Sequence, residues 1–196
     1  MSGDSRRNRS VFSTYNLVLE GICAALITIC SWISVPFGQI PFTLQTLAIF
    51  IVLMLIGGKR GLVSIICYLL LGAVGVPVFS GFRGGFASLA GPTGGFLVAF
   101  IIVALVYWLL ADKLFSGLMT GYKGRVVFNI ITAIVCEIVM YIVGVIWFMA
   151  VYTPDSGRVG VWSALTMCCF PFIIPDIIKL VAASLISSKI YTLVRR

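Results

Sequence analysis

The segment FIIPDIIKLVAASLISSK, residues 172–189, is apolar over most of its length but contains Pro175, Asp176 and Lys179. Asp176 and Lys179 are three residues apart, so they share one face of a helix. A charged side chain at the centre of a membrane helix costs about 3 kcal/mol on insertion scales. We therefore expect this acid and base to be retained for a purpose: an ion pair that holds two helices together, a binding site, or both.

The expected start of this helix follows from its prolines. Pro175 lacks a backbone N–H and favours the first turn of a helix, so we expect the last membrane helix to begin there. The apolar residues 161–174 include Pro171 and form either a short outer helix or a re-entrant cap. Alternatively, the last helix begins near Trp162 and kinks at the prolines.

The composition places the chain in the membrane. Hydrophobic residues make up 61% of the sequence and charged residues 10%, whereas soluble domains are about 25% charged. The mean hydropathy is +1.15. The net charge of +8 does not indicate nucleic acid, because the basic residues sit at membrane boundaries. The sequence therefore predicts an all-α, polytopic membrane protein.

Six apolar runs are long enough to cross a bilayer, or to do so when shielded by neighbouring helices. They cover about residues 17–35, 44–56, 61–76, 93–111, 126–150 and 175–193. We expect one transmembrane domain, residues 17–196, after a cytoplasmic tail, residues 1–16. The tail contains no small-residue cleavage site, so we do not expect it to be a secretory signal peptide.

The basic residues orient these spans, because cytoplasmic loops are enriched in lysine and arginine. One side of the predicted membrane carries eleven of the fourteen: Arg6, Arg7, Arg9, Lys59, Arg60, Lys113, Lys123, Arg125, Lys189, Arg195 and Arg196. The other side carries Arg83 and Arg158, and Lys179 lies within the membrane. The pattern predicts that both termini are cytoplasmic.

Two outward-facing connections are unusual. Residues 35–43, VPFGQIPFT, join the first two spans, and residues 75–95 are long, apolar and rich in glycine. The longer connection is a re-entrant loop, a lid over a cavity or a surface loop. A surface loop is disfavoured because Phe79, Phe82 and Phe86 are poor residues for free solvation.

Several polar residues could converge on an outward-facing pocket. Besides the acid and base of the last helix, the set comprises Glu137 and Tyr141 of the fifth span, Thr43 and Gln45 at the start of the second, and Arg83. Phe42, Phe79 and Trp162 could cover an apolar ligand body. Such a pocket suits a small molecule with polar ends, because carboxylates accept from N–H groups and cations hold carboxylates. The alternative is that Glu137 pairs with Lys179 for structure alone.

Three other acids receive no site role. Glu20 is expected near the cytoplasmic interface in contact with water, and Asp112 and Asp155 in solvated loops. The first span carries two pairs of small residues four apart, Gly21 with Ala25 and Ala24 with Thr28. This spacing permits close helix packing, either within the bundle or against a partner protein.

The sequence disfavours an enzyme. It has no phosphate-binding loop, no histidine, no acidic cluster and no metal-like cysteine spacing; we expect its six cysteines to be small core residues. No inverted repeat is evident, so an autonomous secondary transporter is possible but not indicated. We expect no metal.

Four motifs resemble one known family. They are PFTLQT (residues 41–46), YLLLGAVGVPVF (68–79), GPTGG (91–95) and PDIIK (175–179). Their order and spacing over about residues 17–190 resemble BioY, the biotin-specific substrate-binding (S) component of energy-coupling factor (ECF) transporters. In that family tyrosine often follows GPTGG, whereas this chain has Phe96.

The resemblance implies a six-helix S-component fold in a prokaryotic cell membrane, with biotin bound near the outer face and no cofactor. It also implies partners: a transmembrane coupling protein and two cytoplasmic ABC-type ATPases. The family's binding-site acid and base map onto Asp176 and Lys179. Its AxxxA-type motif, which contacts the coupling protein, maps onto Gly21 and Ala25 or onto Ala24 and Thr28.

The hypothesis is therefore biotin capture. We expect Asp176 to accept from the ureido N–H groups, with Glu137 or Gln45 assisting, and Lys179 or Arg83 to hold the valerate carboxylate. The connections 35–43 and 75–92 would close over the ligand. An S component for another vitamin and a stand-alone ion-coupled carrier are the alternatives.

Overall fold

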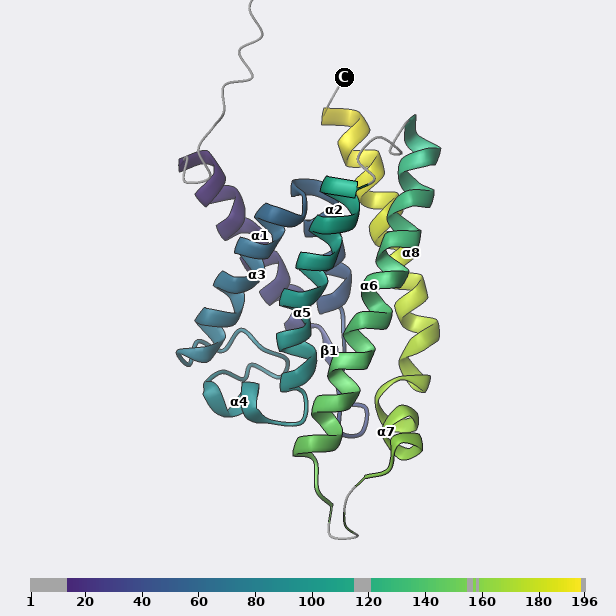
Figure 1. Ribbon diagram of the computed structural model, residues 1–196. Helices are drawn as coiled ribbons and strands as arrows, with labels where there is room; N and C mark the ends of the chain where they lie inside the picture. The colour runs from purple at the N-terminus through teal and green to yellow at the C-terminus, as the bar shows by residue number, and fades with distance from the viewer. Residues whose placement is uncertain (1–13, 115–120, 155–156, 158, 195–196) are drawn as a thin grey trace, which may run out of the picture.

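The structure is a computed structural model, and it describes residues 14–114, 121–154, 157 and 159–194, with side chains described as far as Tyr191. Its helices form one bundle (Figure 1). They are α1 (Thr14–Trp32), α2 (Gln45–Ile56), α3 (Gly58–Ala73), α4 (Phe86–Ala90), α5 (Gly94–Tyr107), α6 (Gly121–Val151), α7 (Val161–Cys168) and α8 (Phe170–Val194). A π-helical segment, η1 (Trp108–Leu114), continues α5.

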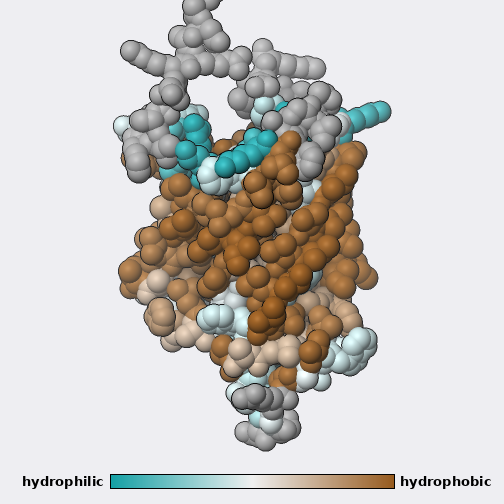
Figure 2. Space-filling view, viewed as in Figure 1, coloured by the Kyte–Doolittle hydropathy of each residue, from teal (hydrophilic) through white to brown (hydrophobic). Residues whose placement is uncertain are grey.

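The bundle has the surface of a membrane protein. Among the described residues, four helical stretches are long and apolar enough to cross a bilayer: Thr14–Trp32, Gly94–Leu114, Gly121–Val151 and Phe170–Tyr191. The helices α2 and α3 have 12 and 16 residues. Isoleucines such as Ile22, Ile138 and Ile178 are exposed on the outside, and an apolar band surrounds the bundle (Figure 2). Such a surface is stable in lipid rather than in water.

The described charges lie mainly at one end of the bundle. We call it the basic end; it carries Lys59, Arg60, Lys113, Lys123, Arg125 and Lys189. The start of α1 and the end of α8 lie there, whereas α4 and α7 lie at the opposite end, the loop end (Figure 1). Other residues used in the charge argument lie outside the described part of the chain: Arg6, Arg7, Arg9, Arg158, Arg195 and Arg196.

The last membrane helix does not begin at Pro175. It begins at Phe170, and Pro175 lies inside it. The carbonyl of Cys169 accepts from the N–H groups of Phe172 and Ile173, so the first turn forms before the proline is reached. Because proline has no backbone N–H, Pro175 cannot donate to the carbonyl of Pro171. Only this one bond is lost, and it lies near the start of the helix, where few other bonds depend on it. The preceding apolar segment forms the short helix α7.

Of the two described acids expected to contact water, Asp112 is exposed as predicted, although it lies in a helical segment rather than a loop, and Glu20 is not exposed. Glu20 of α1 is buried. Asp112 belongs to η1, and its Oδ2 accepts from the Gly58 N–H at 2.8 Å. This bond caps α3 across 54 residues of sequence, because Gly57 and Gly58 bring the α2–α3 turn against η1. Asp155 lies outside the described residues.

Both unusual connections lie at the loop end. Within residues 35–43 the chain makes a small hairpin: β1 (Ser34–Val35) pairs antiparallel with β2 (Phe42–Thr43), Ser34 opposite Thr43. No local pattern in the sequence predicted this pairing. In the longer connection Phe79 and Arg83 form an isolated bridge before α4, and the Trp32 indole N–H donates to the Pro77 carbonyl at 2.8 Å. Phe79 is buried whereas Phe82 and Phe86 are exposed, so the connection is neither a free loop nor wholly buried.

The GPTGG motif is explained by close packing around the start of α5. A Cβ on Gly94 would lie 1.7 Å from the Leu89 carbonyl oxygen, and one on Gly95 would lie 2.2 Å from the Trp147 Cβ of α6. The Trp147 indole N–H also donates to the Gly91 carbonyl at 3.0 Å. These glycines let α4, α5 and α6 approach one another.

We predict that Gly95→Ala destabilises the protein by about 1–3 kcal/mol, the usual cost of overpacking. The Trp147 Cβ is fixed to its backbone and cannot rotate away. Thermal unfolding in detergent measures the effect. Gly21→Ala is the control, because nothing lies within 4 Å of an added Cβ there and alanine favours a helix. Equal unfolding temperatures for the two variants would contradict the packing argument.

Candidate functional site

A cavity of about 530 Å³ opens among the helices toward the loop end. This volume is within the range of sites for drug-sized ligands. Seven of the eight predicted site residues line it: Thr43, Gln45, Phe79, Arg83, Tyr141, Asp176 and Lys179. Further walls come from the hairpin, α4, the start of α5 and the junction of α7 with α8.

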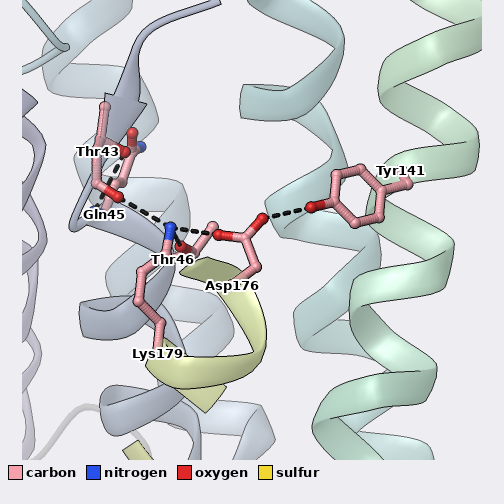
Figure 3. Close-up of polar contacts among 6 residues, drawn as sticks. All are labelled: Thr43, Gln45, Thr46, Tyr141, Asp176 and Lys179. Atoms are coloured by element: carbon pink, nitrogen blue, oxygen red, sulfur yellow. Dashed lines mark hydrogen bonds and ion pairs between the residues drawn. The ribbon is translucent and has the colours of Figure 1, made fainter. Parts of the chain in front are cut away.

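The Lys179 ammonium is held from three directions (Figure 3). It forms an ion pair with Asp176, and it donates to the Thr43 carbonyl at 3.0 Å and to the Thr46 hydroxyl at 2.8 Å. The Phe42 ring centroid lies 4.5 Å from the same nitrogen. An ammonium has three donors, so all of them are used within the protein, and Lys179 ties α8 to β2 and α2.

The Asp176 carboxylate joins this network to α6. Its Oδ1 pairs with Lys179 and its Oδ2 accepts from the Tyr141 hydroxyl (Figure 3). Both charged side chains are buried, with 5% of Asp176 and 7% of Lys179 exposed. A buried charge is tolerated when it is paired and hydrogen-bonded. The arrangement presents an oriented carboxylate and a phenol at the cavity wall.

Glu137 is the predicted site residue that does not line the cavity. It lies one turn before Tyr141 on α6 and is 6% exposed, and neither of its carboxyl oxygens has a hydrogen-bond partner within the described residues. The predicted structural pair with Lys179 does not form; Lys179 pairs with Asp176 instead. Glu137 shares the helix face of Tyr141 but lies one turn farther toward the basic end, so it sits below the cavity wall rather than at its surface.

A second network supports the cavity from α3. The Gln45 side-chain amide donates to the Tyr68 hydroxyl at 2.9 Å, and that hydroxyl donates to the Val78 carbonyl at 3.3 Å. The Ser31 hydroxyl donates to the same carbonyl at 2.5 Å. The Phe79 ring packs edge-on against Tyr68 at 5.5 Å between centroids. The glycine-rich connection is therefore anchored where it enters the cavity wall.

The apolar lining differs from the predicted one. Phe79 lines the cavity, but Phe42 lies beneath Lys179 rather than in the wall. Trp162 is 71% exposed and packs on Phe170, so the prediction that it covers a ligand was wrong. Its position on α7 turns it outward. The additional apolar lining comes from Phe96, Leu97, Phe100, Met140 and Phe172.

Sequence reasoning missed Thr46, Tyr68 and Cys168. Thr46 and Cys168 line the cavity, and Tyr68 braces Gln45 behind it. Thr46 follows Gln45 in the quoted PFTLQT motif and could have been found as a second hydroxyl at the start of an apolar helix. Tyr68 and Cys168 carried no local signal, because an aromatic or thiol side chain in an apolar run is usually part of the core.

The buried pair predicts non-additive stability effects. Removing one partner of a buried ion pair costs about 3–5 kcal/mol, because the other charge is left uncompensated. We therefore expect the single variant Lys179→Met to lower the unfolding temperature in detergent more than the double variant does, in which Asp176→Asn and Lys179→Met are combined. A double variant that unfolds at the sum of the two single effects would show that the pair is not coupled.

Comparison with known proteins identifies the family of this chain. A model of the BioY family matches residues 5–196. The chain is 37% identical over 177 residues to a biotin transporter BioY of Thermotoga maritima, covering 89% of this chain and 94% of that one. It is 35% identical over 173 residues to biotin transporter BioY2 of Lactococcus lactis, covering 87% of each.

A solved structure has the same fold. The crystal structure of the S-component for biotin from an ECF-type ABC transporter matches with a TM-score of 0.77 and 25% sequence identity, over 91% of each chain. By sequence model, by curated relatives and by fold, this chain belongs to the BioY family.

Proposed function

We propose that the chain captures biotin in the cavity, as the membrane S component of an ECF transporter, and takes part in its uptake. The observation that carries this proposal is the buried, oriented Asp176 carboxylate beside the Tyr141 hydroxyl, in a cavity that also presents apolar rings such as Phe79 and Phe96. Biotin has a ureido ring with two N–H donors, an apolar thioether ring and a flexible valerate. A carboxylate is the acceptor that such donors need.

The deep wall of the cavity would hold the ureido ring. Asp176 accepts from a ureido N–H, and Tyr141 and Gln45 complete the polar surroundings. Lys179 acts on Asp176: its ion pair and its bond to the hairpin fix the position of the carboxylate. Glu137 lies behind this wall and supports it rather than contacting the ligand.

Arg83 is the cation that we assign to the valerate carboxylate. The three donors of Lys179 are already used, whereas the Arg83 guanidinium lines the cavity with no hydrogen bond or ion pair to the described residues. An exposed guanidinium can hold a carboxylate through two parallel bonds. Phe79 and Phe96 cover the apolar middle of the ligand.

The same proposal includes a topology. We infer six membrane-crossing helices, α1, α2, α3, α5 with η1, α6 and α8, in one domain after a short tail. The basic end faces the cytoplasm by the positive-inside rule. The cavity then opens to the outside of the cell membrane, where an uptake protein meets its substrate. Neighbouring helices shield α2 and α3, which are shorter than a usual span.

A partner surface lies on α1. Gly21 and Ala25 are exposed on the apolar outside, whereas Ala24 and Thr28 are buried against the bundle. Of the two predicted pairs, only Gly21 with Ala25 can reach another membrane protein. We assign this pair to a transmembrane coupling protein, which two ABC-type ATPases would drive; the chain itself needs no metal or cofactor for this role.

Biotin binding to the purified chain tests the proposal. We expect tight binding by wild type in titration calorimetry and a loss of at least about a hundredfold for Asp176→Asn, because a charge-assisted bond to the ureido group is lost. Asn preserves the shape, so thermal unfolding of the unliganded variant checks that it folds. A folded wild type that binds another vitamin but not biotin would contradict the assignment.

An S component and a stand-alone carrier differ in what drives uptake: ATP hydrolysis by partner proteins in the first case and an ion gradient in the second. We expect uptake of labelled biotin into vesicles only when the coupling protein and ATPases are present with ATP. Uptake by the chain alone, driven by a proton or sodium gradient, would support the carrier instead.

The α1 surface has a matched test. Ala25→Leu is expected to reduce co-purification with the coupling protein, because the larger side chain separates closely packed helices. Ala150→Leu makes the same change on the exposed side of α6 and is expected to have no effect. Biotin binding should persist in both variants. Equal co-purification of the two would remove α1 from the contact.

A further inference from the structure

The two sides of the cavity are built differently. The wall formed by Gln45, Asp176 and Lys179 is buried, and each polar group there is bonded to another element. The opposite side is a rim of exposed or half-exposed residues: Gly38, Gln39, Ser80, Arg83, Ala87 and Ser88. Specific recognition is therefore concentrated at the closed side, and the open side faces water.

The rim consists mainly of small side chains. Gly38, Ser80, Ala87 and Ser88 leave space beside Arg83, the only described basic residue on the rim. Gly38 has a φ of +63° and Gly81, next to Ser80, a φ of +71°, conformations that favour glycine; Phe82, which follows Gly81, is not part of the cavity lining. A chain that leaves the cavity past Arg83 would meet few bulky groups.

We propose that the cavity selects its ligand by the ureido-ring end and accepts extension at the carboxyl end, so that the substrates include amides of biotin with small amines such as lysine. This inference rests on the proposed function and extends it to a substrate class. The amide carbonyl replaces the carboxylate as the acceptor for Arg83, and the added amine chain passes the rim into water.

The energetic cost of this extension is small. Arg83 donates to either acceptor, but its bond to a neutral carbonyl is about half as strong as one to a carboxylate. The loss corresponds to about tenfold weaker binding. The polar groups of the added chain stay hydrated at the exposed rim, so they add no desolvation penalty. By contrast, a ligand without ureido N–H groups leaves the buried Asp176 carboxylate without its ligand donor.

Titration calorimetry on the purified full chain tests the inference with three ligands. They are biotin, its amide with the ε-amine of lysine, and biotin methylated on both ureido nitrogens. We expect the lysine amide to bind within about a hundredfold of biotin and the methylated analogue to bind at least about a thousandfold more weakly than biotin. Binding of the analogue as tight as that of the amide would overturn selection by the ring end.

The outcomes distinguish this inference from the proposed function. If a folded wild type does not bind biotin, both fail. If it binds biotin tightly but the lysine amide more than about a hundredfold more weakly, the proposed function stands and the extension at the rim is wrong.

Two variants test the rim through the ratio of amide to biotin affinity. Arg83→Gln removes the charge, so biotin should lose more affinity than the amide and the two dissociation constants should converge. Ala87→Trp narrows the rim and should weaken the amide more than biotin. An unchanged ratio in both variants would show that the ligand tail does not pass Arg83 and Ala87, and would overturn the proposal.

Discussion

The rest of the cavity depends on the burial of one ammonium group. A charge that leaves water inside a bilayer must be compensated within the protein. Lys179 obtains this compensation from Asp176 of its own helix and from oxygens of Thr43 and Thr46. Because Asp176 also accepts from Tyr141, the one requirement fixes α8, the hairpin, α2 and α6 around a common point. The ligand-facing carboxylate is thereby oriented before any ligand arrives.

The glycine-rich connection is held by a second requirement, that backbone groups inside a membrane protein be satisfied. The Val78 carbonyl accepts from Ser31 and Tyr68, and Trp32 bonds Pro77. The inner part of the connection is therefore rigid while its outer part, with Phe82 and Phe86, remains exposed. Preorganised polar groups lower the entropic cost of binding, and an exposed rim leaves a route of entry.

The two ends of the bundle are stabilised by different means. At the loop end, buried polar contacts surround the cavity. At the basic end, the tight α2–α3 turn is fixed by the bond from Gly58 to Asp112 of η1, and exposed lysines and half-buried arginines lie at the boundary with water. Between them the small residues of α1 leave an exposed apolar strip. This division separates ligand recognition from the surface available to partners.

Much of this protein was determined by the sequence itself. Hydropathy established the membrane class, and the spacing of Asp176 and Lys179 predicted their pairing, because both signals are local. The motifs predicted the family, and seven predicted site residues line the cavity. Only the tertiary structure decided that Pro175 lies within α8, that Glu137 and Trp162 lie off the cavity, and that Lys179 has no donor left for a ligand. The reason is distance along the chain: besides Asp176, the partners of Lys179 are Thr43 and Thr46, which lie 136 and 133 residues away, and no local pattern records which helices bring them together.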